Sequence, residues 1–140
     1  GRLSNFSFLA VLRSLAEIPD LVKSLFVTQT KNDAGIYLVN FFVNGVFTPV
    51  VIDDYLPTFQ NKLAFAGSKS EGEIWVCLLE KAWAKLYGTY TRMEGGNPAF
   101  VWTHLQGTVA ECYDHKEFRN DRDSTGKELE RLIKYAHERG

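Results

Sequence analysis

The stretch EIWVCLLEKAWAKLYG, residues 73–88, has the clearest secondary-structure signal in the chain. Its apolar residues recur every three or four positions, which is the spacing of one face of an α-helix. The residues on this face are Ile74, Trp75, Leu78, Leu79, Ala82 and Leu86. Gly88 is a typical helix stop, because glycine readily adopts the left-handed conformation that ends many helices. We therefore predict a long amphipathic helix that packs this face against the rest of the domain.

Helical spacing also appears near the start of the chain, over residues 5–17. Ser4 or Asn5 is expected to cap this helix, because their side-chain oxygens accept hydrogen bonds from free backbone N–H groups. Pro19 ends it and is favourable in the first turn of a second short helix, residues 19–26. The helix that begins next to Asn5 is the element on which the functional interpretation depends.

A hairpin follows in the sequence NDAGIYLVNFFVNGVFTPVVIDDYLP, residues 32–57. The segments Ile36–Val43 and Val46–Asp53 are rich in β-branched and aromatic residues, and Asn44-Gly45 between them is a strong two-residue turn signal. Pro49 predicts a sheet edge or a bulge, because proline has no N–H to donate to a neighbouring strand.

The remaining segments give weaker signals. Residues 57–73 hold proline, glycine, serine and charges, and are predicted to form a loop. A short helix is predicted over residues 98–105 and a strand over residues 109–113. An amphipathic helix is predicted over residues 124–140.

Size and composition limit the function classes. The chain has 140 residues, 45% of them hydrophobic, which is enough for a domain with its own core. A net charge of −1 argues against a polybasic nucleic-acid surface, and the apolar runs are too short to span a membrane. Cys77 and Cys112 form no CxxC pair, and the three histidines complete no zinc pattern. The two thiols could form one disulfide, but without a signal peptide we expect reduced thiols and a cytoplasmic setting.

Taken together, the order of these segments resembles the protease core of the calpain family of papain-like cysteine proteases. The similar segments are GRLSNFSFLAVLRSLAE (1–17), GIYLVNFFVNGVFTPVVIDDYLPT (35–58), KLAFAGSKSEGEIWVCLLEKAWAKLYGTYTRMEGG (62–96) and GTVAECY (107–113), followed by the final helix. The matching family patterns include Q-G-x-L-G-D-C-W, V-V-x-D-D-x-L-P-T and L-L-E-K-A-Y-A-K. The D-D-x-L-P and L-L-E-K-A patterns are long and specific.

The resemblance implies an α+β fold, the first subdomain of a calpain-like protease. Such a subdomain is mostly helical around a long active-site helix, with a small antiparallel β-hairpin. It would span residues 1–107, and residues 108–140 would be the truncated start of the second subdomain. We therefore expect the chain to be part of a larger polypeptide, with further residues or a partner protein covering the face where the second subdomain belongs.

The catalytic positions depart from the family pattern. Phe6 stands where the nucleophilic cysteine is expected, Ser7 stands in place of the following tryptophan, and Asn5 replaces the preceding aspartate. Papain-like chemistry needs a thiolate activated by an imidazole and by a helix N-terminus, and a phenyl ring supplies no such nucleophile. We expect Phe6 to serve as a packing group, and we assign no catalytic residue and no bound cofactor.

Other residues could act as the nucleophile or the base, but an ordinary structural role is the simpler explanation for each. Ser7 points about 100° around the helix from residue 6 and is expected to make local hydrogen bonds. Cys77 lies in an apolar helix and is expected to be an inert core thiol, and Cys112 stands where the family has tryptophan. His137 falls within the papain-like spacing for a base, but its charged helix end predicts a surface residue. His104 and His115 have no partner that the sequence identifies.

Two acidic segments could supply metal ligands. Asp53 and Asp54 end the second strand, where aspartates commonly accept hydrogen bonds from nearby backbone N–H groups. Glu73 matches a glutamate that contributes to a calcium site in calcium-dependent calpains. Calcium needs six to eight oxygen ligands, and the other family ligands lie before Gly1, so Glu73 is expected to be a helix-start carboxylate.

The sequence supports two functions of different classes. The first is a catalytically inactive calpain-like domain that acts as a structural or protein-interaction module, in the cytoplasm and associated with the cytoskeleton or a cilium. The alternative is a fragment of an active or calcium-regulated calpain-type endopeptidase. The first interpretation expects protein partners, and neither nucleic acid nor a membrane.

Overall fold

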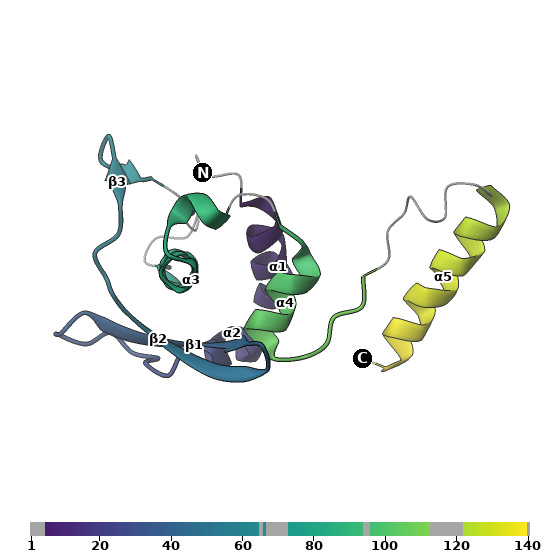
Figure 1. Cartoon of the computed structure of the whole chain (residues 1–140), viewed down its shortest axis with the longest axis horizontal. Coiled ribbons are helices and arrows are strands. Elements are labelled where there is room, and N and C mark those ends of the chain that lie inside the picture. Colours follow the sequence, from purple (N-terminus) through teal and green to yellow (C-terminus); the bar gives the residue numbers. More distant parts are fainter. Residues whose placement is uncertain (1–4, 65, 67–72, 94–95, 113–121, 140) are drawn as a thin grey trace. The chain divides into compact units, whose positions relative to one another are not determined.

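The computed structural model describes residues 5–64, 66, 73–93, 96–112 and 122–139. The chain divides into two compact units, Gly1–Ala110 and Glu111–Gly140. Within these described residues, the larger unit has four α-helices and two small antiparallel hairpins, and the smaller one has a single α-helix (Figure 1). The structure thus has the α+β architecture expected from the sequence. The assignment of the two units to two protease subdomains stays a prediction.

The helices and the first hairpin follow the order expected from the sequence. Their bounds are α1 (Phe6–Ala16), α2 (Pro19–Leu25), β1 (Ile36–Val43), β2 (Val46–Asp53), β3 (Thr58–Phe59), β4 (Lys62–Leu63), α3 (Trp75–Tyr87), a 3₁₀ turn η1 (Tyr90–Met93), α4 (Pro98–Gln106) and α5 (Arg122–Arg139). Gly88 ends α3 with a φ of 93°, as predicted. No helix among the described residues is long and apolar enough to cross a membrane.

The β1–β2 hairpin is confirmed at the predicted bounds. Its register is regular from Ile36 opposite Asp53 to Val43 opposite Val46, with no bulge at Pro49. Both outer edges of the hairpin are occupied by hydrogen-bonding groups. Val27 and Thr28 bond to Leu38 on β1, and lysines of α3 bond to carbonyl groups of β2.

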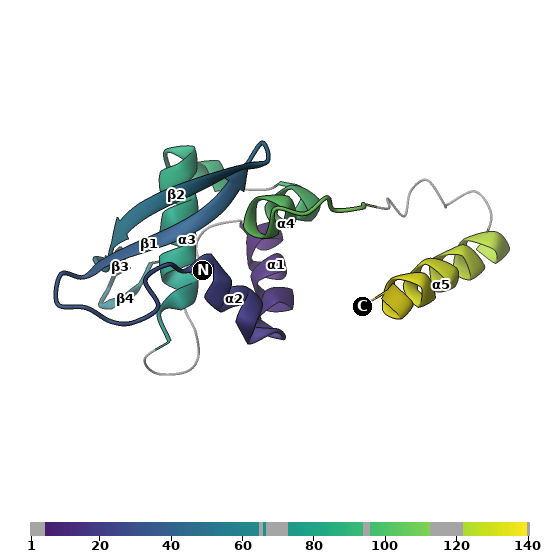
Figure 2. The ribbon, with the colours of Figure 1, turned by 90° about the horizontal axis from the view of Figure 1, so that it is seen from below.

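Helix α3 lies at the centre of the larger unit. Figure 1 looks along its axis, with the β1–β2 hairpin below it, the β3 hairpin on one side and α1 and α4 on the other. Figure 2, turned by 90°, shows α3 crossing the two strands of the hairpin. The helix is therefore buried on more than one face, and the single-face prediction was too narrow. Glu80 and Trp83 are 2% and 4% exposed, whereas Ile74, predicted to be in the core, is 39% exposed.

Trp83 is the centre of the aromatic core. Its ring lies 5.0 Å from that of Phe8 on α1 and 5.7 Å from that of Phe41 on β1. It also contacts His104 of α4 edge-on at 5.8 Å. Because aromatic side chains bury large apolar areas, one residue of α3 ties three other elements together.

Two predictions in irregular segments are wrong. The segment 57–73 was expected to be a loop, but it contains the small β3–β4 hairpin, whose turn residues Gln60 and Asn61 both have positive φ. Such a turn usually carries glycine, so the sequence signal was missing. In the predicted strand 109–113, residues 109–112 are irregular, and Tyr113 lies outside the described residues. β-propensity alone does not form a strand without a partner to pair with.

The smaller unit contains the helix α5. Its helix α5 begins two residues before the predicted start, and Gly140 lies outside the described residues. Lys134 and Glu130 form an ion pair one turn apart, with 2.8 Å between nitrogen and oxygen. Ile133 and Tyr135 are exposed on this helix.

Candidate functional site

The N-terminus of α1 is the candidate site, because the nucleophile position falls on its first residue, Phe6. The residue before it, Asn5, has the non-helical backbone of an N-cap, but its side chain makes no capping hydrogen bond. The expectation that Asn5 caps the helix is therefore wrong, and Ser4 lies outside the described residues. Asn5 is 1% exposed, and its Nδ2 donates instead to Oε1 of Glu80 on α3 at 2.6 Å.

Phe6 points away from the core. Its side chain is 75% exposed, whereas Phe8, two residues later, is 2% exposed and packs on Trp83. The prediction that Phe6 is a packing group is therefore wrong within this chain. Two residues along a helix differ by about 200° in direction, so one of the two rings faces the core and the other faces away.

Ser7 makes a hydrogen bond, but not the local one expected near a helix start. Its Oγ donates to the carbonyl oxygen of Gly96 at 2.7 Å, 89 positions along the chain. Gly96 lies two residues before α4. Ser7 therefore connects the first turn of α1 to the segment that leads into α4.

The histidines differ in their surroundings. His104 is 6% exposed, its ring centroid lies 4.0 Å from that of Phe100, and its Nδ1 donates to the carbonyl oxygen of Phe100 at 2.8 Å. A general base must reach the proton that it removes, and this ring is held inside an aromatic cluster. His137 is exposed on α5, as predicted for a surface residue, and His115 lies outside the described residues.

The two cysteines differ in their surroundings. Cys77 is 4% exposed, and its Sγ donates to the carbonyl oxygen of Ala66 at 3.1 Å, as expected of a core thiol. Burial raises the pKa of this thiol, and the neighbouring Glu80 raises it further. A raised pKa disfavours the thiolate, which is the reactive form. Cys112 is exposed in the smaller unit.

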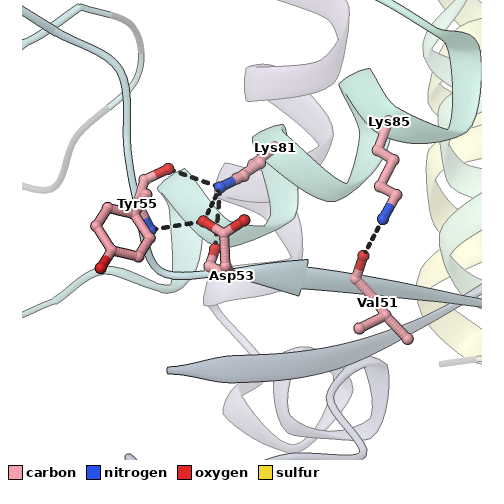
Figure 3. A network of polar contacts seen from close by, with 5 residues as sticks. All are labelled: Val51, Asp53, Tyr55, Lys81 and Lys85. Carbon is pink, nitrogen blue, oxygen red and sulfur yellow. Dashed lines mark hydrogen bonds and ion pairs between the residues drawn. The ribbon is translucent and has the colours of Figure 1, made fainter. Parts of the chain in front are cut away.

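Asp53 belongs to a clamp between β2 and α3. Figure 3 shows Lys81 Nζ against the Asp53 carboxylate and the carbonyl oxygens of Asp53 and Tyr55, and Lys85 Nζ against the carbonyl oxygen of Val51. Asp53 Oδ1 also accepts from the Tyr55 N–H at 2.8 Å, which confirms the predicted backbone role. The hydrogen bond from Lys81 lowers the pKa of the Asp53 carboxyl.

The proposed calcium position, Glu73, lies just before the helix. It precedes the N-cap Ile74 of α3, and it lines a groove of about 880 Å³ to which Asp54, Trp75 and Lys31 also contribute. Within the described part of the chain, no three histidine, cysteine, aspartate or glutamate side chains gather closely enough to hold a metal ion. The described residues therefore do not assemble a calcium cage around Glu73.

The α+β fold agrees with the comparisons to known proteins. The model of the calpain family of cysteine proteases matches residues 1–140, and the chain belongs to this family. The chain is 35% identical to the calpain-type cysteine protease DEK1 of Arabidopsis thaliana over 140 residues, 99% of this chain and 6% of that protein. It is 35% identical to mouse calpain-5, covering 100% of this chain and 23% of that protein.

A nematode relative is more similar over a shorter stretch. Calpain-5 of Caenorhabditis elegans is 42% identical over 108 residues, which cover 76% of this chain and 17% of that protein. The chain thus spans less than a quarter of the length of each of these three relatives.

The sequence pattern did not reveal that polar side chains of α3 bond to other segments. Glu80, Lys81 and Lys85 each bond to a segment distant in sequence, and none was named as a site residue. The signal available was Glu80, a lone acidic residue within the apolar run WVCLLE. A buried carboxylate needs hydrogen-bond donors, but spacing along one helix does not say which segment supplies them.

Proposed function

We propose that this chain is a catalytically inactive member of the calpain family, and that it acts as a structural or protein-interaction module within a larger polypeptide or assembly. The observation that carries the proposal is Phe6 at the start of α1. A phenyl ring stands at the position where the resemblance places the nucleophilic cysteine, and it cannot attack a carbonyl carbon.

The surroundings of Phe6 support the same function. The core that positions α1 is intact, with Phe8 packed against Trp83 and Asn5 bonded to Glu80. The first turn therefore has an ordered fold without a nucleophile at its start. Exposed aromatic rings, Phe6 at 75% and Phe100 at 48%, suit contact with another protein segment better than contact with water.

The proposal includes a setting and partners. We place the module in the cytoplasm, with association to the cytoskeleton or a cilium, and with protein segments as its partners. The net charge of −1 offers little attraction to nucleic acid. No cofactor is part of the proposal, and Glu73 is at most the vestige of a calcium site.

The second candidate is an active or calcium-regulated calpain-type endopeptidase. It is favoured by the names of the relatives, which are a calpain-type cysteine protease and calpains. It requires a nucleophile other than residue 6. Among the described residues, Ser7 is engaged with Gly96 and Cys77 is buried, so neither is well placed for the task.

Peptide cleavage by the intact native protein separates the two candidates. Cleavage of a fluorogenic peptide would be measured with and without calcium, using native protein and the Phe6→Cys and Phe6→Ala variants. We expect no turnover from native protein, and none from the 140-residue chain carrying Phe6→Cys, because His104 is buried in an aromatic cluster and His137 is an exposed residue at a charged helix end. Calcium-stimulated cleavage by native protein would contradict the proposal. Cleavage restored by Phe6→Cys in the intact protein would weaken it, since the rest of the machinery would then persist.

A further inference from the structure

The contact between Asn5 and Glu80 joins two residues far apart in the sequence inside the core. Asn5 and Glu80 are 1% and 2% exposed. The Asn5 Nδ2 donates to Glu80 Oε1 at 2.6 Å, and the Ala66 N–H donates to Glu80 Oε2 at 2.9 Å. Both carboxylate oxygens are therefore paired with donors from segments outside α3.

Two titratable groups of the described residues face Glu80, and both are neutral. They are the thiol of Cys77, one turn earlier on α3, and the phenol of Tyr90 on η1, and burial raises the pKa of each, that of Tyr90 to about 12. The first turn of α1 carries no acidic residue. Burial also raises the pKa of Glu80, although the hydrogen bonds from Ala66 and Asn5 and the positive charge of the N-terminal amine act in the opposite direction. The two N–H donors thus favour the charged form of a carboxyl group whose charge burial disfavours.

We infer that positions 5 and 80 form a buried pair that accommodates one carboxylate and one amide, and that this pair fixes the first turn of α1 to the centre of α3. Two carboxylates at hydrogen-bond distance in a buried site cannot both be ionised, because their repulsion is poorly screened. An amide opposite a carboxylate supplies the donor that the carboxylate needs. Asn5 thus acts as a positioning residue for α1, which explains why its side chain does not cap the helix.

This inference does not depend on whether the protein cleaves peptides. The calpain pattern has aspartate at position 5, so Asn5→Asp restores the family residue. In this chain, that substitution alone would place a second carboxyl beside Glu80, and the pair would have to share one proton. The cost of keeping that proton bound grows as the pH rises, because the same carboxyl groups are ionised in the unfolded chain. The first turn of α1 would therefore be held less firmly at high pH than at low pH.

The pair can be tested by exchanging its two members. Hydrogen–deuterium exchange of the peptide covering the first turns of α1 would be measured by mass spectrometry in the intact native protein, at about pH 6 and pH 8, with correction for intrinsic exchange. We expect Asn5→Asp to lower the protection of this peptide about tenfold or more at pH 8, and less at pH 6. Asn44→Asp, the same change on the exposed hairpin turn, is the matched control and should leave this peptide unaffected at both pH values.

The double variant Asn5→Asp/Glu80→Gln restores one carboxylate and one amide with their positions exchanged. The new amide at position 80 can donate to the new carboxylate at position 5, and its carbonyl oxygen can still accept from the Ala66 N–H. We therefore expect protection close to that of native protein at both pH values. Recovery in the double variant supports the inference even if Asn5→Asp alone does not fold. Native protection in Asn5→Asp at pH 8, or a double variant no better protected than Asn5→Asp, would overturn it.

Discussion

The first turn of α1 and the clamp between β2 and α3 differ in how closely their residues match the calpain family patterns. The clamp joins the two most specific family patterns, because Lys81 of the L-L-E-K-A segment bonds to Asp53 of the D-D-x-L-P segment. The start of α1 and the residues before it depart from their pattern at four consecutive positions, residues 4–7. One region thus keeps the residues of its family pattern, and the other does not.

This difference separates residues that the fold needs from a residue whose side chain the fold does not need. The clamp residues hold a strand edge against the central helix, so their loss would affect every function of the fold. Phe6 is exposed, so the identity of its side chain has little effect on folding. A protein can therefore lose a nucleophile at that position and keep its core, and the comparison can be tested by breaking each region in turn.

The largest expected effect comes from the core side of the first turn. Phe8→Ala should lower the free energy of unfolding by about 3–5 kcal/mol, because it removes a buried ring packed on Trp83 and leaves a cavity. Phe6→Ala is the matched control, the same change two residues earlier, and should alter stability by about 0.5 kcal/mol or less. Urea unfolding of the intact protein measures both. Equal losses would mean that Phe6 is buried by a segment outside the described residues.

The clamp should give an intermediate effect. Lys85→Met removes one hydrogen bond to the Val51 carbonyl oxygen and should cost about 0.5–1.5 kcal/mol. Lys81→Met should cost more, because Lys81 Nζ bonds to two carbonyl oxygens as well as a carboxylate and its side chain is only 19% exposed. The two variants would be compared by urea unfolding. A greater loss from Lys85→Met would contradict the assignment of Lys81 as the main clamp residue.

The smallest expected effect is on how stability falls at acid pH. Lys81 lowers the pKa of Asp53 below its ordinary value of 3.8, so the folded state favours the charged carboxylate. Its contribution to stability is complete above pH 3.8 and is lost as the pH falls through the lower pKa of the folded state. Asp53→Asn should therefore flatten the fall in the urea midpoint at acid pH. An unchanged acid slope in this variant would show that other carboxyls produce it.

Sequence patterns predicted the elements better than they predicted the site. The β1–β2 hairpin was predicted at its bounds, because alternating β-branched residues and Asn44-Gly45 encode strand and turn locally. The β3–β4 hairpin was missed, because its positive φ angles fall on Gln60 and Asn61. The direction of Phe6 was also predicted wrongly, because one residue does not show which side of its helix faces the core.

The sequence by itself determined the family, the order of the helices and the hairpin, and the absence of a thiol at position 6, since these follow from residue identity and local periodicity. Only the tertiary structure decided that Asn5 pairs with Glu80, that Ser7 bonds to Gly96 and that Lys81 holds Asp53. The physical reason is that a buried polar group must find a partner, and that partner is chosen by packing between segments distant in the sequence.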